Sequence, residues 1–327
     1  MKNKYILKNY TDLSNPLLGT KIISCSDQFF GPAKRMLNQN EPIFKENLFD
    51  HHGKWMDGWE TRRKRTKGND YAIIKLGKPG KIKLIDVNTS FFNGNQPQHI
   101  QIEGCYSENK NTKNFKWIKI TKKNKVKPNS QNFFKSLTSK TLTHVKLNIY
   151  PDGGVARLRL FGDIDLSLNK YVKNKIINLS ELSNGAQIIA CSDEHFGNVN
   201  NILLPGKSIN MGNGWETRRR RGDGYDWVII KLGYLGLITS FEISTHYFKG
   251  NYPDSFSIQA FNNNKNISIR NLIKNSKKWH TLKSKTKLKP NDTLKIKIMK
   301  ISNKFNYIKL NIYPDGGISR FKIFGKL

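Results

Sequence analysis

The chain of 327 residues carries a formal net charge of +33, and 37% of its residues are hydrophobic. This length allows two ordinary domains, each with a core of its own. No apolar run approaches the roughly 20 residues that a membrane-spanning helix needs, and the N-terminal MKNKYILKNYTDL lacks the continuous apolar core of a signal peptide. The three cysteines, at wide spacing, suggest neither a disulfide framework nor a zinc site. We therefore expect a soluble, cytoplasmic protein.

The positive charge is distributed in two different ways. Lysines are scattered, often beside asparagine as in NNNKNIS (262–268), which is typical of solvated loops. Only 12 of the 57 basic residues are arginine, and seven of these lie in GWETRRKR (58–65) and GWETRRRR (214–221). Scarce arginine in two clusters favours bidentate recognition of a small anion. Such a net charge is also typical of nucleic-acid binding, but no nucleic-acid-binding motif accompanies it.

Sequence blocks of the first half recur in the second half in the same order, which indicates a tandem duplication. The first repeat then covers residues 1–165 and the second covers 166–327. They join in the polar stretch 163–177, for which we predict some helix. The paired blocks, in chain order, are SCSDQFFG (24–31) with ACSDEHFG (190–197), GWETRRKR with GWETRRRR, YAIIKLG (71–77) with WVIIKLG (227–233), NTSFFNGN (88–95) with STHYFKGN (244–251), and VKLNIYPDGGVARLRLFG (145–162) with IKLNIYPDGGISRFKIFG (308–325).

Within each repeat, apolar and polar residues alternate over short segments. Val145, Leu147 and Ile149 alternate with polar residues, and the second repeat copies this pattern from Ile308 onward. Turn sequences such as PDGG separate the segments, and long stretches with the 3.6-residue period of a helix are missing. Many short antiparallel strands in about 160 residues predict an all-β fold of two tandem jelly-roll β-sandwiches joined by a short linker. Further predicted strands are 82–90, 99–106, 116–120 and 256–261.

The PDGG sequence (151–154 and 314–317) has the residues of a tight β-turn. Proline presets φ, and Asp-Gly or Gly-Gly tolerates positive φ, so a plain structural turn is one interpretation. Arg157 and Arg320 follow the two turns at equivalent positions. An arginine directly after a tight turn lies at the end of a sandwich, where ligand loops gather. We therefore expect the turns to take part in binding as well.

Glutamate and arginine stand close together in both GWETRR sequences. A solvent-exposed ion pair, worth about 0–1 kcal/mol, is the plain structural interpretation. The neighbouring Trp59 and Trp215 would partly shield the charges from water. A shielded acid beside arginines can bind a small anion and also transfer a proton. The candidates are Glu60, Arg62 and Arg63 in the first repeat and Glu216, Arg218 and Arg219 in the second.

Among the histidines, His246 is the candidate for proton transfer, since it lies at a predicted strand end beside Gly250 and Asn251. A structural or exposed histidine is the alternative. HxH, HExxH and CxxC spacings are missing, as are a glycine-rich phosphate loop and a GxSxG elbow, so we expect no zinc site of known spacing. A divalent metal held by scattered carboxylates would leave no linear pattern, and metal dependence stays open.

Taken together, the blocks resemble the allantoicase (allantoate amidinohydrolase) family. The resemblance rests on SDQFFGPAKR, GKWMDGWETRRKR, NTSFFNGN and PDGGVARLRLFG in the first repeat. In the second it rests on SDEHFG, MGNGWETRRRRGDGYDWVIIKLG, THYFKGNYPDS and PDGGISRFKIFG. It implies two jelly-roll repeats of the galactose-binding-like class and assembly into a homo-oligomer. It also implies hydrolysis of allantoate to ureidoglycolate and urea.

The implied reaction gives roles to the candidate residues. The urea anion is a poor leaving group, so a general acid should protonate it. A base should either activate water or remove a proton from the remaining ureido group to help expel urea. Arginine should bind the substrate carboxylate bidentately, while amide groups hold the ureido oxygens. For proton transfer the sequence offers Glu60, Glu216 and His246, and behind them Asp27, Asp193, Asp152 and Asp315. For substrate binding it offers Arg62, Arg63, Arg157, Arg218, Arg219, Arg320, Asn95, Asn251, Asp152 and Asp315.

Two other functions compete with this one. A duplicated jelly roll also suits a non-catalytic carbohydrate- or small-ligand-binding module, although paired Glu-Arg-Arg clusters fit a small anion better than a sugar. A nucleic-acid binder is supported by charge alone. Asp57 becomes Asn213 and Ser90 becomes His246 between the repeats. The sequence therefore leaves open whether both repeats hold a working site, one does, or the two share one.

Overall fold

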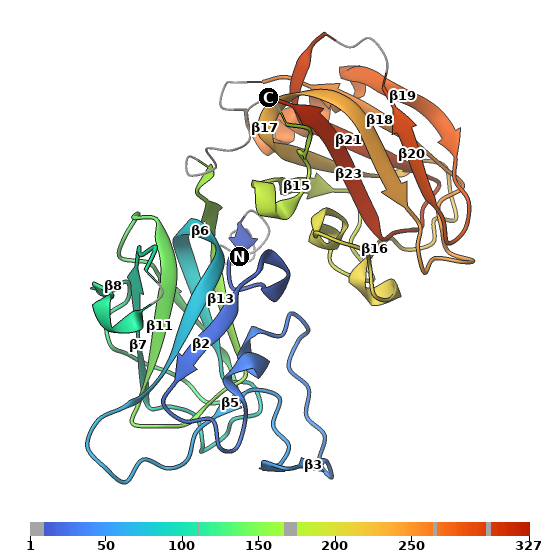
Figure 1. The fold of residues 1–327 in the computed structure, drawn as a ribbon. Coiled ribbons are helices and arrows are strands. Elements are labelled where there is room, and N and C mark those ends of the chain that lie inside the picture. Colours follow the sequence, from blue (N-terminus) through green and yellow to red (C-terminus); the bar gives the residue numbers. More distant parts are fainter. Residues whose placement is uncertain (1–9, 110, 167–174, 264–266, 299–301) are drawn as a thin grey trace. The chain divides into compact units, whose positions relative to one another are not determined.

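The computed structural model describes residues 10–109, 111–166, 175–263, 267–298 and 302–327. The chain forms two compact, β-rich units, one that covers Tyr10–Asp165 and one that covers Leu166–Leu327 (Figure 1). The connecting stretch 163–177 is described only to residue 166 and again from residue 175. The helix predicted there from sequence therefore falls mainly outside the described residues.

The first unit is built from short strands around one long strand. Its strands are β1 (Thr11–Asp12), β2 (Lys21–Cys25), β3 (Phe49–Asp50), β4 (Gly53–Lys54), β5 (Trp59–Glu60), β6 (Asp70–Asn88), β7 (His99–Cys105), β8 (Ile118–Lys119), β9 (Asn124–Lys125), β10 (Gln131–Lys135), β11 (Leu142–Tyr150), β12 (Gly154–Val155) and β13 (Arg157–Ile164). Its 3-10 helices are η1 (Pro16–Leu18), η2 (Ala33–Leu37) and η3 (Thr112–Asn114).

The long strand β6 belongs to both layers of the first sandwich. Its first half pairs antiparallel with β2 and β11, and Ile74 lies opposite Val145. Its second half pairs with β10 and β13. The bend between the halves contains Gly77, where a Cβ would lie 2.0 Å from the carbonyl oxygen of Leu18. Only glycine lets the backbone of β6 pass so close to that of Leu18, so the strand can bend at this position.

The second unit repeats this plan, with β17 as the long strand that pairs with β15 and β21 in one half and with β20 and β23 in the other. Its strands are β14 (Ile177–Asn178), β15 (Gln187–Cys191), β16 (Trp215–Glu216), β17 (Asp226–Ser244), β18 (Ser255–Phe261), β19 (His280–Lys287), β20 (Thr293–Lys297), β21 (Lys304–Tyr313), β22 (Gly317–Ile318) and β23 (Arg320–Lys326). Its helices are η5 (Leu182–Asn184), η6 (Val199–Leu203), η7 (Met211–Asn213), α2 (Ile269–Asn275) and η8 (Ser276–Lys278).

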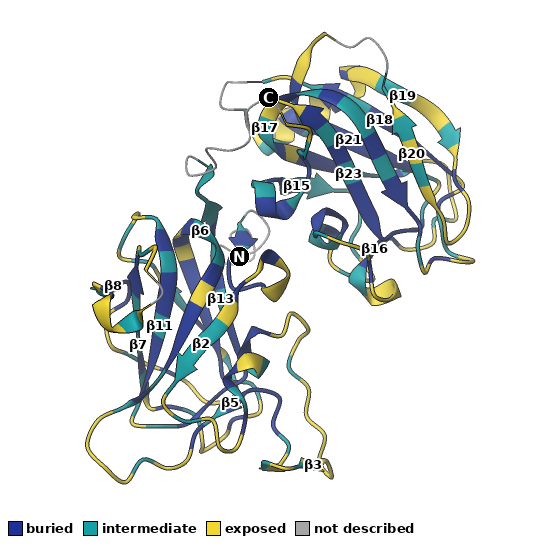
Figure 2. Cartoon of the chain, in the orientation of Figure 1, coloured by how far each residue is buried: buried dark blue, intermediate teal, exposed yellow. Residues whose placement is uncertain are grey.

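The alternation seen in the sequence defines the core of each sandwich. Val145 and Leu147 on β11 are fully buried, as are Ile308 and Leu310 on β21. Buried residues recur along both strands (Figure 2). Burial of this apolar area drives the two layers together. The prediction of two jelly-roll sandwiches is confirmed. In the described residues α2 is the one α-helix, and no helix there is long and apolar enough to cross a membrane.

One part of the outer sheet face of the second unit is covered, which the sequence did not predict. Leu272 on α2 and Trp279 after η8 pack with Ile229, an outward residue of β17. Lys309 occupies a polar position of the alternation on β21, yet it is only 3% exposed. Its ammonium group donates a hydrogen bond to Ser276 Oγ at 3.1 Å. The covering segment therefore buries a lysine that the alternation alone would place in solvent.

Asp86 on β6 is a buried carboxyl group of the first unit, only 2% exposed, and its burial affects its pKa. Burial raises its pKa from 3.8 to about 7, although the charge of Arg159 opposes the shift. The folded state therefore holds the proton more tightly than the unfolded chain does. The resulting stability is present at low pH and is lost as the pH rises through the raised pKa. Asp86→Asn should stabilise the protein more at pH 8 than at pH 5, by on the order of 2–3 kcal/mol.

Denaturant unfolding of the parent and Asp86→Asn proteins at the two pH values measures this change. Asp223→Asn is the control, because Asp223 is exposed. A difference in unfolding free energy that is the same at both pH values would contradict the raised pKa of Asp86.

Candidate functional site

The GWETRR segment of the first unit begins as a two-residue strand between other loops. β5 pairs with β12, which places Trp59 opposite Val155 and Glu60 opposite Gly154. On its other side, Glu60 forms an antiparallel bridge with Gly31. The fully buried indole of Trp59 donates to the carbonyl oxygen of Asp27 at 2.8 Å. The tryptophan therefore fixes the SDQFFG loop beside the glutamate.

The PDGG turn continues to hold the main chain beyond the glutamate. The Thr61 amide donates to the Gly153 carbonyl at 3.3 Å, and the Gly153 amide donates back to Thr61 Oγ1 at 3.1 Å. The Lys64 amide donates to Asp152 Oδ2 at 2.6 Å. Asp152, predicted as a substrate-binding residue, thus binds the main chain of the arginine loop.

The second unit reproduces these contacts. Glu216 lies opposite Gly317 on β22 and forms a bridge with Phe196. The Trp215 indole donates to the Asp193 carbonyl at 2.9 Å. The arginine loop is held as in the first unit, because the amide of Arg220 donates to Asp315 Oδ2 at 2.7 Å. Asp315 therefore has the same role as its counterpart in the first unit.

Each glutamate meets an asparagine from a neighbouring loop. Asn95 Nδ2 donates to Glu60 Oε1 at 2.8 Å, and Asn251 Nδ2 donates to Glu216 Oε1 at 2.6 Å. Burial raises the pKa of Glu60, and the hydrogen bond from Asn95 partly opposes that shift. Both glutamates are half-buried. Among the described residues, neither glutamate forms the ion pair with arginine that the plain structural interpretation expects. The side-chain amide of an asparagine binds each carboxylate instead.

The loops that carry the asparagines are positioned by a buried phenylalanine. Phe92 is 1% exposed and packs against Gly154, where a Cβ would lie 2.0 Å from the ring. Phe248 packs against Gly317 in the same way. The second glycine of each PDGG turn therefore leaves room for the ring that orients the asparagine loop.

Arg62 and Arg218 lie over the SDxxFG loops and have partners. Arg62 Nε donates to Asp27 Oδ2 at 2.8 Å, and its guanidinium carbon lies 5.1 Å from the centre of the Phe29 ring. Arg218 Nε donates to Nδ1 of His195, the residue that replaces Phe29, at 3.1 Å. Both arginines are exposed, so their remaining N–H groups face solvent.

Arg63 and Arg219 are exposed at the next position of each loop. Among the described residues, neither guanidinium group has a hydrogen-bonding or ion-pair partner. A planar guanidinium with five free N–H donors is suited to bind a carboxylate bidentately. The guanidinium groups of these two arginines are therefore accessible to an anion from solvent.

Arg157 and Arg320 were predicted to bind the substrate carboxylate, but they are 1% and 2% exposed. Arg157 Nη2 donates to Asp57 Oδ2 at 2.6 Å, and its Nη1 donates to the Asp57 carbonyl at 2.7 Å. Arg320 Nη2 donates to Asn213 Oδ1 at 2.6 Å. Arg157 and Arg320 are therefore not grouped with the exposed arginines of the GWETRR loops. They bind the residue directly before GWETRR and connect that loop to the sheet.

His246 lies in a different pocket of the second unit, with a volume of about 200 Å³. Glu242 and Arg320 line the same pocket. No hydrogen bond among the described residues joins His246 to Glu216. The first unit has Ser90 at the equivalent position, so this grouping is not repeated there.

Within the described part of the chain, no group of three or more His, Cys, Asp or Glu side chains is arranged to hold a metal ion. The arrangement in each unit instead offers a half-buried acid, an amide and two exposed guanidinium groups. Such a set can bind a small carboxylate and exchange a proton with it.

Sequence reasoning missed the residues that anchor the arginine loops. Lys64 Nζ lies 3.0 Å from Asp70 Oδ1, and Arg220 Nη2 lies 2.5 Å from Asp226 Oδ1. Both carboxylates are buried. The one signal in the sequence was a cation six positions before an aspartate in both repeats. Arg220 therefore belongs to the scaffold, although it lies in the arginine cluster.

Known proteins resemble this chain over nearly its whole length. The family model described as "Allantoicase repeat" matches residues 11–165 and 177–327. A "Probable allantoicase" of Acinetobacter baumannii (strain SDF) is 44% identical over 324 residues, 98% of this chain and 95% of the relative. Another, from Pseudomonas aeruginosa (strain LESB58), is 41% identical over 325 residues, 98% of this chain and 96% of the relative.

The solved structures include close matches too. The crystal structure of allantoicase from Saccharomyces cerevisiae aligns with a TM-score of 0.83 at 32% identity, and it covers 99% of this chain and 97% of its own. A second structure of allantoicase aligns with a TM-score of 0.84, also at 32% identity, with the same coverage. The resemblance seen in the sequence motifs is confirmed, and the chain belongs to the allantoicase family.

Proposed function

We propose that this protein hydrolyses allantoate to ureidoglycolate and urea. The observation that carries the proposal is that both units build the same group by the same contacts: a glutamate held by an asparagine, followed by an exposed arginine without a partner. The relatives that carry the name allantoicase support the choice of substrate. The alternative of a non-catalytic carbohydrate-binding module is not favoured by any of these contacts.

In this proposal, Arg63 or Arg219 binds the carboxylate of allantoate. Both guanidinium groups are exposed and unpaired among the described residues, so binding breaks no existing ion pair. Arg62 and Arg218 lie one residue away and contribute further positive charge. Because charge-assisted bidentate bonds are directional, they fix the central carbon of the substrate relative to the glutamate.

Glu60 or Glu216 then transfers the protons. Its carboxyl group protonates a ureido nitrogen, and the central C–N bond breaks with its electron pair on the departing urea. The lone pair of the remaining ureido nitrogen stabilises the carbon as an acyl iminium ion. Water adds to that carbon, and the glutamate takes the proton of the water. The carboxyl group is thereby protonated again, and no further acid is needed.

The asparagine contact orients the carboxyl group for this proton route. Since Asn95 and Asn251 donate to Oε1, that oxygen acts as an acceptor, and Oε2 of each glutamate is left to carry the proton. The raised pKa of Glu60 also favours a protonated carboxyl group at the start of the reaction.

The cellular setting is part of the same proposal. None of the three cysteines forms a disulfide within the described residues, which fits a reducing compartment, and we propose that the protein is cytoplasmic. Assembly into a homo-oligomer, which the family resemblance implies, stays a prediction that sedimentation of the purified protein would test.

Removing both glutamate carboxyl groups tests the proton route. The Glu60→Gln/Glu216→Gln protein should release urea from allantoate about 100- to 10,000-fold more slowly, because the amide cannot donate the carboxyl proton. Each single variant then reports how much its unit contributes. Glu108→Gln, at an exposed position, is the matched control. Near-parental rates in the double variant, or loss of activity only in His246→Ala, would instead assign the reaction to another group.

The pH profile of one unit tests the direction of proton transfer. In Glu216→Gln the first unit alone keeps its glutamate, and burial raises the pKa of Glu60. The acid form starts the reaction, so kcat should fall as the pH rises through that pKa. A kcat that rises over the same range would show that Glu60 acts only as a base.

Arginine-to-lysine changes test the carboxylate clamp. Arg63→Lys/Arg219→Lys keeps the charge but loses the guanidinium fork, so the KM for allantoate should rise about tenfold or more. Arg270→Lys, on an exposed position of α2, is the control. An unchanged KM in the double variant would remove these arginines from the site.

A further inference from the structure

A larger polar pocket lies on the outer sheet face of the second unit, between β18, β19 and β21. Its volume is about 520 Å³, within the range of small-molecule sites. Tyr225 and Tyr313 form one wall, with ring centres 5.0 Å apart. It shares no lining residue with the site around Glu216.

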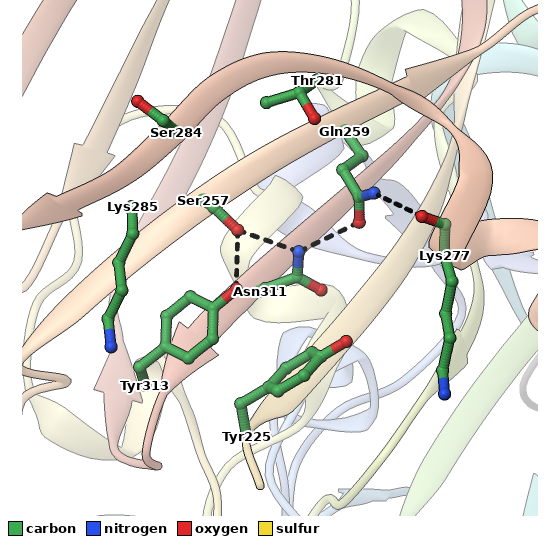
Figure 3. A pocket seen from close by; sticks show the side chains of 9 residues that line it. All are labelled: Tyr225, Ser257, Gln259, Lys277, Thr281, Ser284, Lys285, Asn311 and Tyr313. Carbon is green, nitrogen blue, oxygen red and sulfur yellow. Dashed lines mark hydrogen bonds between the residues drawn. The ribbon is translucent and has the colours of Figure 1, made fainter.

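The pocket contains a buried acceptor without a partner. Asn311 is 2% exposed, and its Nδ2 donates to Ser257 Oγ at 3.0 Å and to Gln259 Oε1 at 3.2 Å (Figure 3). Gln259 is oriented in turn, since its Nε2 donates to the Lys277 carbonyl at 3.4 Å. This network turns the Asn311 amide so that its Oδ1 has no hydrogen-bond donor within the described part of the chain. A buried acceptor left unpaired is costly, and a ligand donor would satisfy it.

In the first unit the equivalent side-chain oxygen has a hydrogen-bond donor within the protein. Asn148 takes the place of Asn311, and its Oδ1 accepts a hydrogen bond from Asn69 Nδ2 at 3.3 Å. The second unit has Tyr225 where the first has Asn69, so the internal donor is replaced by a ring. The first unit also has Glu103 at the position of Gln259, and its carboxylate accepts from Asn148 at 3.0 Å.

The two charged residues that line the pocket of the second unit are both basic. Lys277 and Lys285 line it and lie on opposite sides of the tyrosines (Figure 3). Lys285 Nζ is 4.6 Å from the centre of the Tyr313 ring. None of the lining residues is acidic. Two exposed ammonium groups with no acid between them favour an anion.

We propose that this pocket binds a small organic anion that also carries hydroxyl groups, with the size of a sugar phosphate or a sugar acid. Lys277 and Lys285 bind its charge, and Asn311 Oδ1 accepts from one of its hydroxyls. The tyrosine rings supply an apolar wall for its carbon skeleton. The proposal does not depend on the hydrolysis of allantoate, because none of these residues belongs to that site.

Titration calorimetry of the purified protein tests the ligand chemistry. Ribose 5-phosphate and gluconate represent the phosphate and carboxylate forms of the ligand, while ribose lacks the charge and inorganic phosphate lacks the carbon skeleton. At least one of the two organic anions should bind with a Kd below about 1 mM. Ribose and inorganic phosphate should each bind about tenfold more weakly or worse. Absence of binding by both organic anions, or equal binding of inorganic phosphate, would overturn the proposal.

Two variants that copy the first unit locate the binding. Tyr225→Asn supplies an internal donor for Asn311, and Gln259→Glu adds a negative charge. Each should weaken binding about tenfold or more. Lys278→Gln removes an exposed charge that does not line the pocket and should change the Kd less than about twofold. Thermal melting confirms that each variant is folded. Unchanged binding in both variants would place the anion elsewhere and refute the proposal.

Discussion

The aspartate of each PDGG turn accepts a hydrogen bond from the main chain of the arginine loop, and the rest of the site depends on this contact. In the first unit the Lys64 amide lies 2.6 Å from Asp152 Oδ2, and in the second the Arg220 amide lies 2.7 Å from Asp315 Oδ2. A carboxylate is a stronger acceptor than a carbonyl. The aspartate therefore fixes the arginine loop against the PDGG turn. In this position the glutamate accepts a hydrogen bond from the asparagine, and the two arginines that follow it remain exposed.

The duplication shows which features this arrangement requires and which can change. Both units keep the glutamate–asparagine contact, but Arg62 lies over Phe29 whereas Arg218 binds His195. Beneath the site, the carboxylate partner of Arg157 is replaced by Asn213 beside Arg320. Burial without that carboxylate lowers the pKa of Arg320 to about 10. The chemistry proposed for the exposed groups is thus common to both units, while the scaffold below them has diverged.

The sequence predicted the fold well because its signals are local: alternation such as Val145–Ile149 determines which side chains face the core. The glutamates and asparagines that it offered as site candidates are joined by hydrogen bonds in both units, while their roles in the reaction stay a proposal. It did not predict that Arg157 is buried, since this depends on the loop that carries Asp57, about a hundred positions away. Nor did it predict the burial of Lys309, because a covering segment distant in sequence is responsible. Long-range packing decided both cases.

A crystal structure of the Glu60→Gln/Glu216→Gln protein with bound allantoate tests the central claim most directly. The account predicts that the carboxylate of the ligand contacts the guanidinium group of Arg63 or Arg219 and that a ureido nitrogen lies within hydrogen-bond distance of the substituted side chain. Allantoate bound instead beside His246 and Arg320, with the exposed arginines unoccupied, would contradict the account.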